Sequence, residues 1–317
     1  MLKTEFGVFL SPEKNDFNSI LDEAFLCEEL GYDSIWISDH LIGMYENPGD
    51  PRFECWTTST ALLANTTRIK MGQLVMANPF RHPPLLAKMA ATLDNISEGR
   101  LILGLGTGWH EGEFEAYGYP YESPRDRVRR LDEAAEIIKK MWTEPSPSFE
   151  GDFYRISKAY CAPKPVQRPH PPLMLAGGGE QLTLRTVARY ADISNFAAWM
   201  GSTKDFRHKI NVLNRHCLEV GRDFNEITKS WAAYILISED EKKAEMDISE
   251  YTKNMQIRCG TSSVNRTPRL VGTPENIAAQ IESYREEGCE LFILRFMGGN
   301  QEKELSLFAD EVLPEFK

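Results

Sequence analysis

Short hydrophobic runs alternate with amphipathic segments from one end of the chain to the other. The runs are rich in β-branched and aromatic side chains and are bounded by turn residues, which is typical of buried strands. The segments between them place apolar residues three and four positions apart, as on one face of a helix. The runs predict eight strands, at residues 4–10, 33–38, 69–76, 100–105, 173–176, 192–196, 230–237 and 291–296.

Helix boundary signals support this alternation. A cap at Asn15 or Asp16 opens the first predicted helix, and Gly31 follows its end. Ser123 and Pro124 open the helix after the fourth strand, because serine can accept from free helix amides and proline loses nothing at the first position. Eight strands separated by helices favour a closed (β/α)8 TIM barrel over an open doubly wound sheet.

Two segments do not fit the repeat and are predicted to be insertions, at 143–172 after the fourth βα unit and at 239–270 after the seventh. Residues 1–317 are therefore expected to form a single domain. The second insertion holds four basic residues, which either fold over the barrel and bind an anionic group or remain a solvated surface. These four are Lys253, Arg258, Arg266 and Arg269.

Composition narrows the choice of partners. Hydrophobic residues make up 42% of the 317 residues and charged residues 26%, an ordinary globular balance. The net charge of −11 argues against nucleic acid and anionic membranes as partners. No apolar run reaches the roughly 18–20 residues that span a bilayer, so we expect a cytoplasmic protein. The six cysteines are scattered without a C-x-x-C pair, which predicts reduced thiols and neither zinc nor disulfides.

In a barrel of this kind, chemistry takes place at the C-terminal ends of the strands. The second strand ends in Asp39 and His40. At this position a carboxylate can fix a cofactor and a histidine can transfer protons, whereas an isolated pair of this type is usually a cap or a structural contact. Glu54 and Trp56 follow in the next loop and are candidates to face the same region.

Glycines gather at the ends of the fourth and fifth strands. Gly104, Gly106 and Gly108 resemble a dinucleotide fingerprint, but Trp109 occupies the last glycine position and the motif does not open a βαβ unit. These glycines either let the chain turn or let a flat cofactor approach the backbone. A second set directly precedes a helix whose free amides suit an anion such as phosphate, and it consists of Gly177, Gly178 and Gly179.

Other polar residues near the strand ends have simpler interpretations. His82 and His110 are expected to be loop contacts, and His170, in a proline-rich segment, is expected to be structural. No set of carboxylates and histidines stands at metal-ligand spacing at the strand ends, which argues against a metal-dependent hydrolase.

Three segments, at 34–42, 71–114 and 163–179, resemble the luciferase-like monooxygenase superfamily, and in particular its branch that uses the deazaflavin coenzyme F420. The resemblance implies an isoalloxazine-type ring over the barrel, a homodimer, and a non-prolyl cis peptide at Leu74 and Val75 that supports the ring. It also implies contacts from Asp39 and Ala77. The cofactor's phosphate or side chain would be held by Thr107, Gly108, Gly177, Gly178 and Gly179, and the predicted cofactor-binding residues also include Gly106 and Glu180.

The Asp39-His40 ending favours F420 over FMN within this family. The resemblance then implies hydride transfer between F420 and a small organic substrate, with His40 in proton transfer. In relatives that oxidise sugar phosphates an acid follows the Gly-Thr-Gly sequence, but here Trp109 stands at that position. This difference argues against a sugar phosphate and favours a more apolar substrate, with Glu54 as an alternative acid.

Two alternatives remain open. One is an FMN-dependent monooxygenase of the same fold, which uses O2 and a separate reductase. The other is a non-catalytic flavin-binding protein, in which replacement of His40 would change no reaction.

Overall fold

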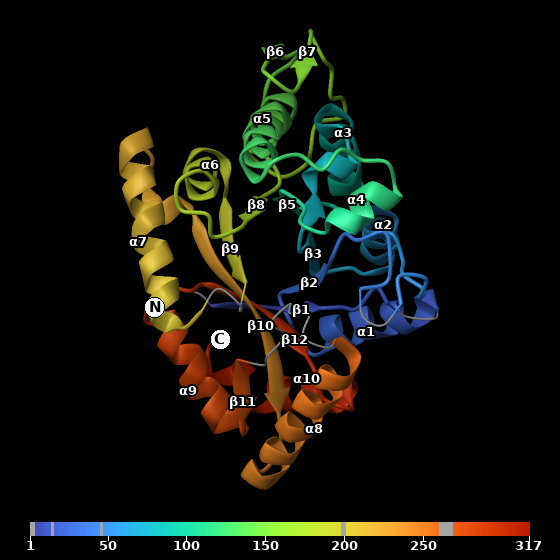
Figure 1. Ribbon diagram of the computed structural model, residues 1–317, viewed down its shortest axis with the longest axis vertical. Helices are drawn as coiled ribbons and strands as arrows, with labels where there is room; N and C mark the ends of the chain where they lie inside the picture. The colour runs from blue at the N-terminus through green and yellow to red at the C-terminus, as the bar shows by residue number, and fades with distance from the viewer. Residues whose placement is uncertain (1–3, 14–15, 45–46, 198–200, 260–268) are drawn as a thin grey trace.

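Eight parallel strands close into a ring, which confirms the predicted (β/α)8 barrel (Figure 1). The computed structural model describes residues 4–13, 16–44, 47–197, 201–259 and 269–317, with the backbone alone for 252–259. The strands of the ring are β1 (Glu5–Phe9), β2 (Ser34–Ile37), β3 (Lys70–Gln73), β5 (Leu101–Gly106), β8 (Leu173–Ala176), β9 (Ile193–Ala197), β10 (Thr228–Ile237) and β12 (Leu291–Phe296). The remaining strands are β4 (Met76–Ala77), β6 (Phe149–Glu150), β7 (Arg155–Ile156) and β11 (Leu270–Gly272).

The ring closes because β10 pairs with β9 on one side and with β12 on the other. Trp231 of β10 lies opposite both Phe196 of β9 and Phe292 of β12. Strand β12 in turn pairs with β1, where Leu294 lies opposite Val8. After a break that follows β3, the short strand β4 continues alongside β5 in the same place in the ring. All eight predicted strands are present, and neighbours follow chain order, as helical crossovers between parallel strands require.

Helices cover the outside of the ring (Figure 1). In chain order they are α1 (Phe17–Glu29), α2 (Cys55–Asn65), α3 (Pro83–Ile96), α4 (Glu111–Ala116), α5 (Pro124–Thr143), α6 (Thr183–Tyr190), α7 (Thr203–Val220), α8 (Glu241–Cys259), α9 (Pro274–Arg285) and α10 (Gln301–Glu311). In the part of the chain that the structure describes, no helix combines the length and apolar character needed to cross a membrane.

Local chemistry sets the helix boundaries as predicted. The Asp16 carboxylate accepts from the Ser19 amide at 3.0 Å and caps α1. Ser123 caps α5 by accepting from the Asp126 amide at 3.2 Å. Gly31 has φ +82°, a left-handed conformation that favours glycine where the chain leaves α1.

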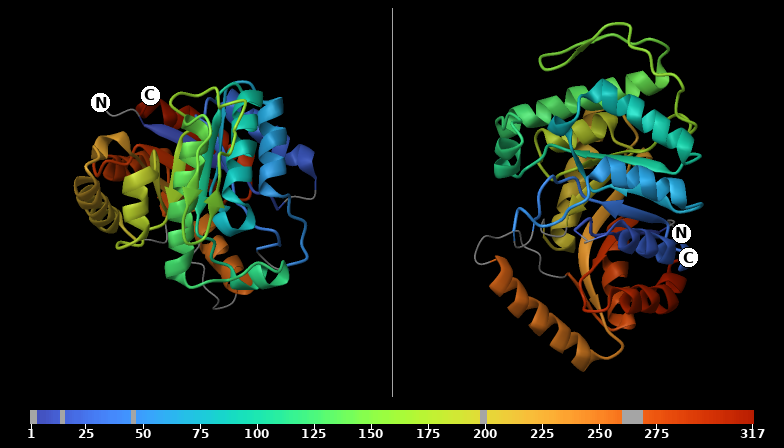
Figure 2. Two further views of the ribbon diagram at one scale, coloured as in Figure 1. Left: turned by 90° about the horizontal axis from the view of Figure 1, so that it is seen from above. Right: turned by 90° about the vertical axis from the view of Figure 1, so that its right-hand side faces the viewer.

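Both predicted insertions stand apart from the ring. The first carries the β6–β7 hairpin, and the Glu133 carboxylate of α5 holds it by accepting from the amides of Asp152 at 2.8 Å and Tyr154 at 3.0 Å. The second contains α8 and ends at β11, which pairs with the end of β10. The hairpin and α8 project at opposite ends of the molecule (Figure 2).

Trp36 fills the interior of the barrel below the strand ends. Its side chain is fully buried, and Nε1 donates to Ser34 Oγ at 2.8 Å. Gly7 and Gly72 on the two neighbouring strands face the indole, and a Cβ at either position would overlap it. Buried apolar side chains from the other strands pack in the same interior cluster, namely Phe9, Ile102, Met174, Ile193, Leu291 and Ile293. The interior is therefore solid here, and only its C-terminal end can host chemistry.

Candidate active site

Inward-facing side chains at the C-terminal strand ends are part-exposed, whereas the inward-facing side chains two residues earlier on the same strands are buried. Because side chains alternate along a strand, Ala176 faces inward like buried Met174, and Arg295 faces inward like buried Ile293. We call this set the barrel mouth, and it comprises Ser38, Leu74, Val75, Ala176, Ala197, Ala232, Tyr234 and Arg295. Most of its members are small or apolar, so the mouth offers room for a flat ring.

The peptide bond between Leu74 and Val75 is cis, at the position that the family resemblance implied. It lies in the break between β3 and β4, where both side chains belong to the barrel mouth. Glycines on the adjoining strand accommodate this segment. A Cβ on Gly106 would lie 2.6 Å from Val75 Cγ2, and a Cβ on Gly104 would overlap the Gln73 carbonyl oxygen. Gly104 is thus required by the neighbouring backbone, and Gly106 by the Val75 side chain.

Asp39 is buried in an ion pair and does not face the mouth. Its carboxylate accepts from the two terminal nitrogens of Arg81 at 2.7 and 3.0 Å and from the Ala77 amide at 3.0 Å. Burial opposes the charge on Arg81, but the Asp39 carboxylate outweighs it and raises the pKa of Arg81. The Asp39 side chain, which was expected to contact a cofactor, therefore ties the end of β2 to β4. Only the main chain of Asp39 is left for such a contact.

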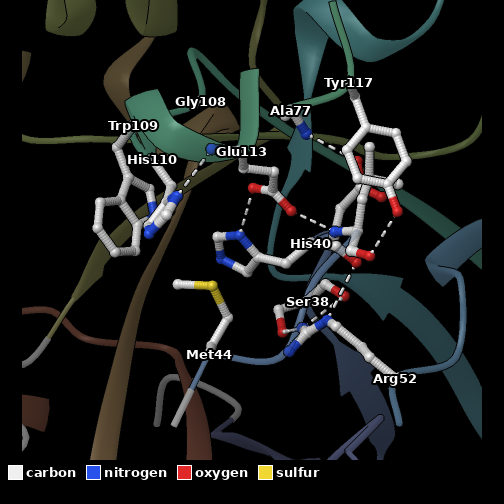
Figure 3. Close-up of polar contacts among 12 residues, drawn as sticks. Ser38, His40, Met44, Arg52, Ala77, Gly108, Trp109, His110, Glu113 and Tyr117 are labelled. Carbon is white, nitrogen blue, oxygen red and sulfur yellow. Dashed lines mark hydrogen bonds and ion pairs between the residues drawn. The ribbon is translucent and has the colours of Figure 1, made fainter. Parts of the chain in front are cut away.

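His40 stands two residues after Ser38 of the mouth, and the partner of its side chain is Glu113 on α4 (Figure 3). Nδ1 of His40 lies 2.9 Å from Oε2 of Glu113, and the other carboxylate oxygen of Glu113 accepts from the Leu41 amide. The Glu113 side chain is 1% exposed, while that of His40 is 16% exposed. Glu113 is not among the residues predicted from the sequence, because the family pattern places an acid directly after Gly108, where Trp109 stands.

The Glu113 carboxylate is ionised at neutral pH. Burial alone would raise its pKa, but the hydrogen bond from His40 and the one from the Leu41 amide outweigh burial and lower the pKa. An ionised carboxylate is an acceptor only, so the network assigns the proton to Nδ1 of His40. Nε2 of neutral His40 is then free of a proton, which suits it to accept one from a substrate.

A second buried ion pair supports His40 from below. Arg52 donates from Nε to the His40 carbonyl at 3.0 Å and from Nη2 to Ser38 Oγ at 2.7 Å. Glu13 pairs with Arg52 and also accepts from the Met44 amide at 2.8 Å. Burial lowers the pKa of Arg52, and the Glu13 carboxylate opposes that effect. The main chain of the 38–44 segment is thus held by charge-assisted hydrogen bonds.

Trp109 forms an aromatic wall beside His40. The two rings meet edge to face with centroids 5.7 Å apart, and the Trp109 side chain lies against that of His110. Trp109 is 52% exposed, which is unusual for so large an apolar side chain. In Figure 3 the His40 ring lies between Glu113 and Met44, with Trp109 and His110 to one side. His110 itself caps α4 by accepting from the Glu113 amide at 3.1 Å, a structural contact as expected.

The glycine loop (Gly177, Gly178 and Gly179) lies at the end of β8, next to the Thr107-Gly108 turn at the end of β5. Within the described ranges, no acceptor bonds the amides of Gly178 and Gly179. Gly177 has φ +136°, which requires glycine. Free amides that lead into α6 suit an anion. Glu180, in contrast, points away and pairs with His208 and Lys209 of α7, so the structure separates it from the other predicted contacts.

The remaining candidates lie away from the mouth. Glu54 caps α2 through the Trp56 and Thr57 amides and also pairs with Arg81, and these bonds outweigh burial and lower its pKa. Trp56 is buried in the core. Of the predicted basic cluster, Arg269 is exposed, and the side chains of Lys253, Arg258 and Arg266 lie outside the described residues. The described part of the chain contains no group of three potential metal ligands.

Curated relatives of this chain include enzymes of two cofactor types. An FMNH2-dependent dimethylsulfone monooxygenase of Pseudomonas putida is 30% identical over 292 residues, which covers 84% of this chain and 79% of the relative. An F420-dependent glucose-6-phosphate dehydrogenase of Amycolatopsis mediterranei is 27% identical over 341 residues, which covers 100% of this chain and 99% of the relative.

Solved structures share the fold at low sequence identity. An F420-dependent secondary alcohol dehydrogenase in complex with an F420-acetone adduct superposes with a TM-score of 0.85 at 21% identity, over 100% of both chains. An F420-dependent tetrahydromethanopterin reductase from Methanopyrus kandleri has a TM-score of 0.82 at 21% identity, over 99% of this chain and 100% of the reductase. A family model described as luciferase-like monooxygenase matches residues 1–291. This chain therefore belongs to the luciferase-like monooxygenase family.

Proposed function

We propose that this protein is an oxidoreductase that transfers a hydride between coenzyme F420 and a small organic substrate. The observation that carries the proposal is the hydrogen bond between His40 and Glu113, which leaves Nε2 of His40 available at the barrel mouth. Oxidation of an alcohol removes a hydride from carbon and a proton from oxygen, so it needs a base beside the hydride acceptor. In the reverse direction the ring begins as the imidazolium, and its Nε2 gives the proton to the forming alkoxide.

The residues of the mouth fit a flat tricyclic ring. The Leu74–Val75 segment and the short side chains Ala176, Ala197 and Ala232 present an apolar surface, and Tyr234 and Arg295 stand beside it. Main-chain atoms of Asp39 and Ala77 would contact the edge of the ring, while Thr107, Gly108 and the glycine loop would hold the phosphate. When bound, the deazaflavin supplies two-electron hydride chemistry.

Each residue near His40 then has a defined task. Nε2 of His40 takes or gives the substrate proton, and the Glu113 carboxylate stabilises the imidazolium that forms, as a buried carboxylate does for other catalytic histidines. The Arg52–Glu13 pair fixes the His40 main chain. Trp109 excludes water on the exposed side and favours a substrate with an apolar group.

A second candidate is an FMN-dependent monooxygenase, favoured by the similarity to the dimethylsulfone monooxygenase. It requires the same mouth but a reduced flavin that reacts with O2. The third candidate is a non-catalytic flavin-binding protein. It gives no role to the hydrogen bond between His40 and Glu113. Cofactor binding separates the first two candidates, and substitution at His40 separates both from the third.

Titration of the apo-protein with each cofactor tests the cofactor assignment. We expect F420 to bind at least about tenfold more tightly than FMN, a difference of about 1.4 kcal/mol. Quenching of the cofactor's own fluorescence gives both dissociation constants. Tight FMN binding together with indifference to F420 would overturn the assignment and favour the monooxygenase.

Substitution of the two paired residues tests the proton-transfer role, once a substrate has been found by screening alcohols and ketones. His40→Asn should lower kcat by about 10²- to 10⁴-fold, the usual contribution of general acid–base catalysis. Glu113→Gln keeps the size of the side chain but removes its charge, and should lower kcat by up to about 10⁴-fold, as the same change does behind another catalytic histidine, with KM little changed.

Glu111→Gln is the matched control, because Glu111 lies on the same helix and is exposed. It should leave kcat at the wild-type value, and all three variants should bind F420 with wild-type affinity. A Glu113→Gln variant with unchanged kcat, or a His40→Asn variant that turns over normally, would contradict the assigned roles.

We also propose that the whole chain forms one domain, that it works in the cytoplasm and that it pairs as a homodimer. Five cysteines are buried free thiols, which suits a reducing compartment.

On α3 the side chains of Leu85 and Ile96 are 57% and 50% exposed and lie three turns apart on one face, as in a helix that packs against a partner. Sedimentation should show a dimer that Leu85→Glu with Ile96→Glu converts to a monomer, and a wild-type protein that sediments as a monomer would overturn the pairing.

A further inference from the structure

A cleft of about 300 Å³ lies between α5 and α6, outside the barrel mouth. Figure 1 shows the two helices side by side, and the Thr186 hydroxyl of α6 donates to the Asp132 carboxylate of α5 at 2.9 Å to join them. The cleft reaches the lower end of the size range of small-molecule sites. Its walls are formed by Val128, Arg129 and Asp132 on one side and by Leu182, Arg185 and Arg189 on the other.

Both walls continue directly from the loops proposed to hold the cofactor's phosphate. Leu182 follows the glycine loop by three residues. Val128 follows Arg127, whose guanidinium donates to the Gly108 carbonyl at 2.7 Å. In a (β/α)8 barrel the N-terminal ends of the helices lie on the same face as the C-terminal ends of the strands. A ligand with its phosphate at these loops therefore reaches the cleft by extending outward from the mouth.

The cleft is lined by three arginines and two carboxylates, so one positive charge is in excess. Asp132 accepts from Thr186 and pairs with Arg189 at 3.1 Å, and Glu133 accepts three amides of the β6–β7 hairpin. Arg129 pairs with Asp126 and Asp152. Arg185 is exposed and, among the residues that the structure describes, has no ion-pair or hydrogen-bond partner.

We propose that the cleft between α5 and α6 binds the acidic glutamyl tail of F420, with Arg185 as its principal contact. The inference rests on the proposed function, since FMN ends at its phosphate and has no tail to place there. A guanidinium recognises carboxylates through paired N–H donors, and the apolar Val128 and Leu182 side chains can pack on the methylenes of the tail. The cleft thereby adds a contact that discriminates F420 from FMN.

The test compares binding of three probes to wild-type protein and to variants at low salt, where an exposed contact is least screened. The probes are F420 with its glutamyl tail, F420 with its phosphate but no glutamates, and FMN. We expect Arg185→Gln to weaken tailed F420 by about threefold, as for an exposed ion pair, and Arg185→Glu to weaken it by about tenfold through repulsion. The other two probes should bind with unchanged affinity.

Arg215→Gln is the control, because Arg215 is an exposed arginine on α7 that does not line the cleft. It should leave all three dissociation constants unchanged, and circular dichroism should show every variant folded. Equal affinity of wild-type protein for tailed and tailless F420, with no effect of Arg185→Glu, would overturn this inference and leave the proposed function intact. Binding of FMN with no binding of either form of F420 would overturn the proposed function itself.

Discussion

The carboxylate of Glu113 joins two parts of the barrel that are far apart in the chain. One oxygen binds the His40 ring and the other binds the Leu41 amide, so the end of β2 is held against the start of α4. A buried carboxylate is costly unless its hydrogen bonds favour the charged form, and here they lower its pKa. The orientation of His40, the position of Trp109 beside it and the accessible side of the mouth all follow from this contact.

The rest of the barrel supplies a rigid setting for that contact. Trp36 fills the interior below, against two glycines that leave space for its indole. Two buried ion pairs, Asp39 with Arg81 and Arg52 with Glu13, fasten the chain on either side of His40. These ion pairs hold the main chain around His40 and leave its Nε2 for a substrate. Such a site suits the transfer of one proton next to a hydride.

Strand positions and the polar strand ends could be predicted from sequence because they depend on local patterns. Alternation of buried runs with helices determines the fold class, and the turn glycines at 177–179 follow from their place before a helix. The resemblance to a known family added the cis peptide at Leu74 and Val75, which no local pattern indicates.

Side-chain partners could not be predicted in this way, because they join distant segments. Glu113 is 73 residues from His40, and Arg81 is 42 residues from Asp39. Asp39 and Glu180 have the residue types expected of cofactor ligands, yet each is turned towards a cation on another element. One sequence feature could have indicated Glu113 as a site residue. It is an acid in the first turn of the helix that begins just after Gly108.

The most direct test of this account is the ring nitrogen spectrum of His40 in protein labelled with ¹⁵N histidine, where the His40→Asn variant identifies the signal among six histidines. The account predicts that neutral His40 carries its proton on Nδ1 and leaves Nε2 bare, and that Glu113→Gln disturbs this preference. A proton on Nε2 of neutral His40 in the wild-type protein would contradict it.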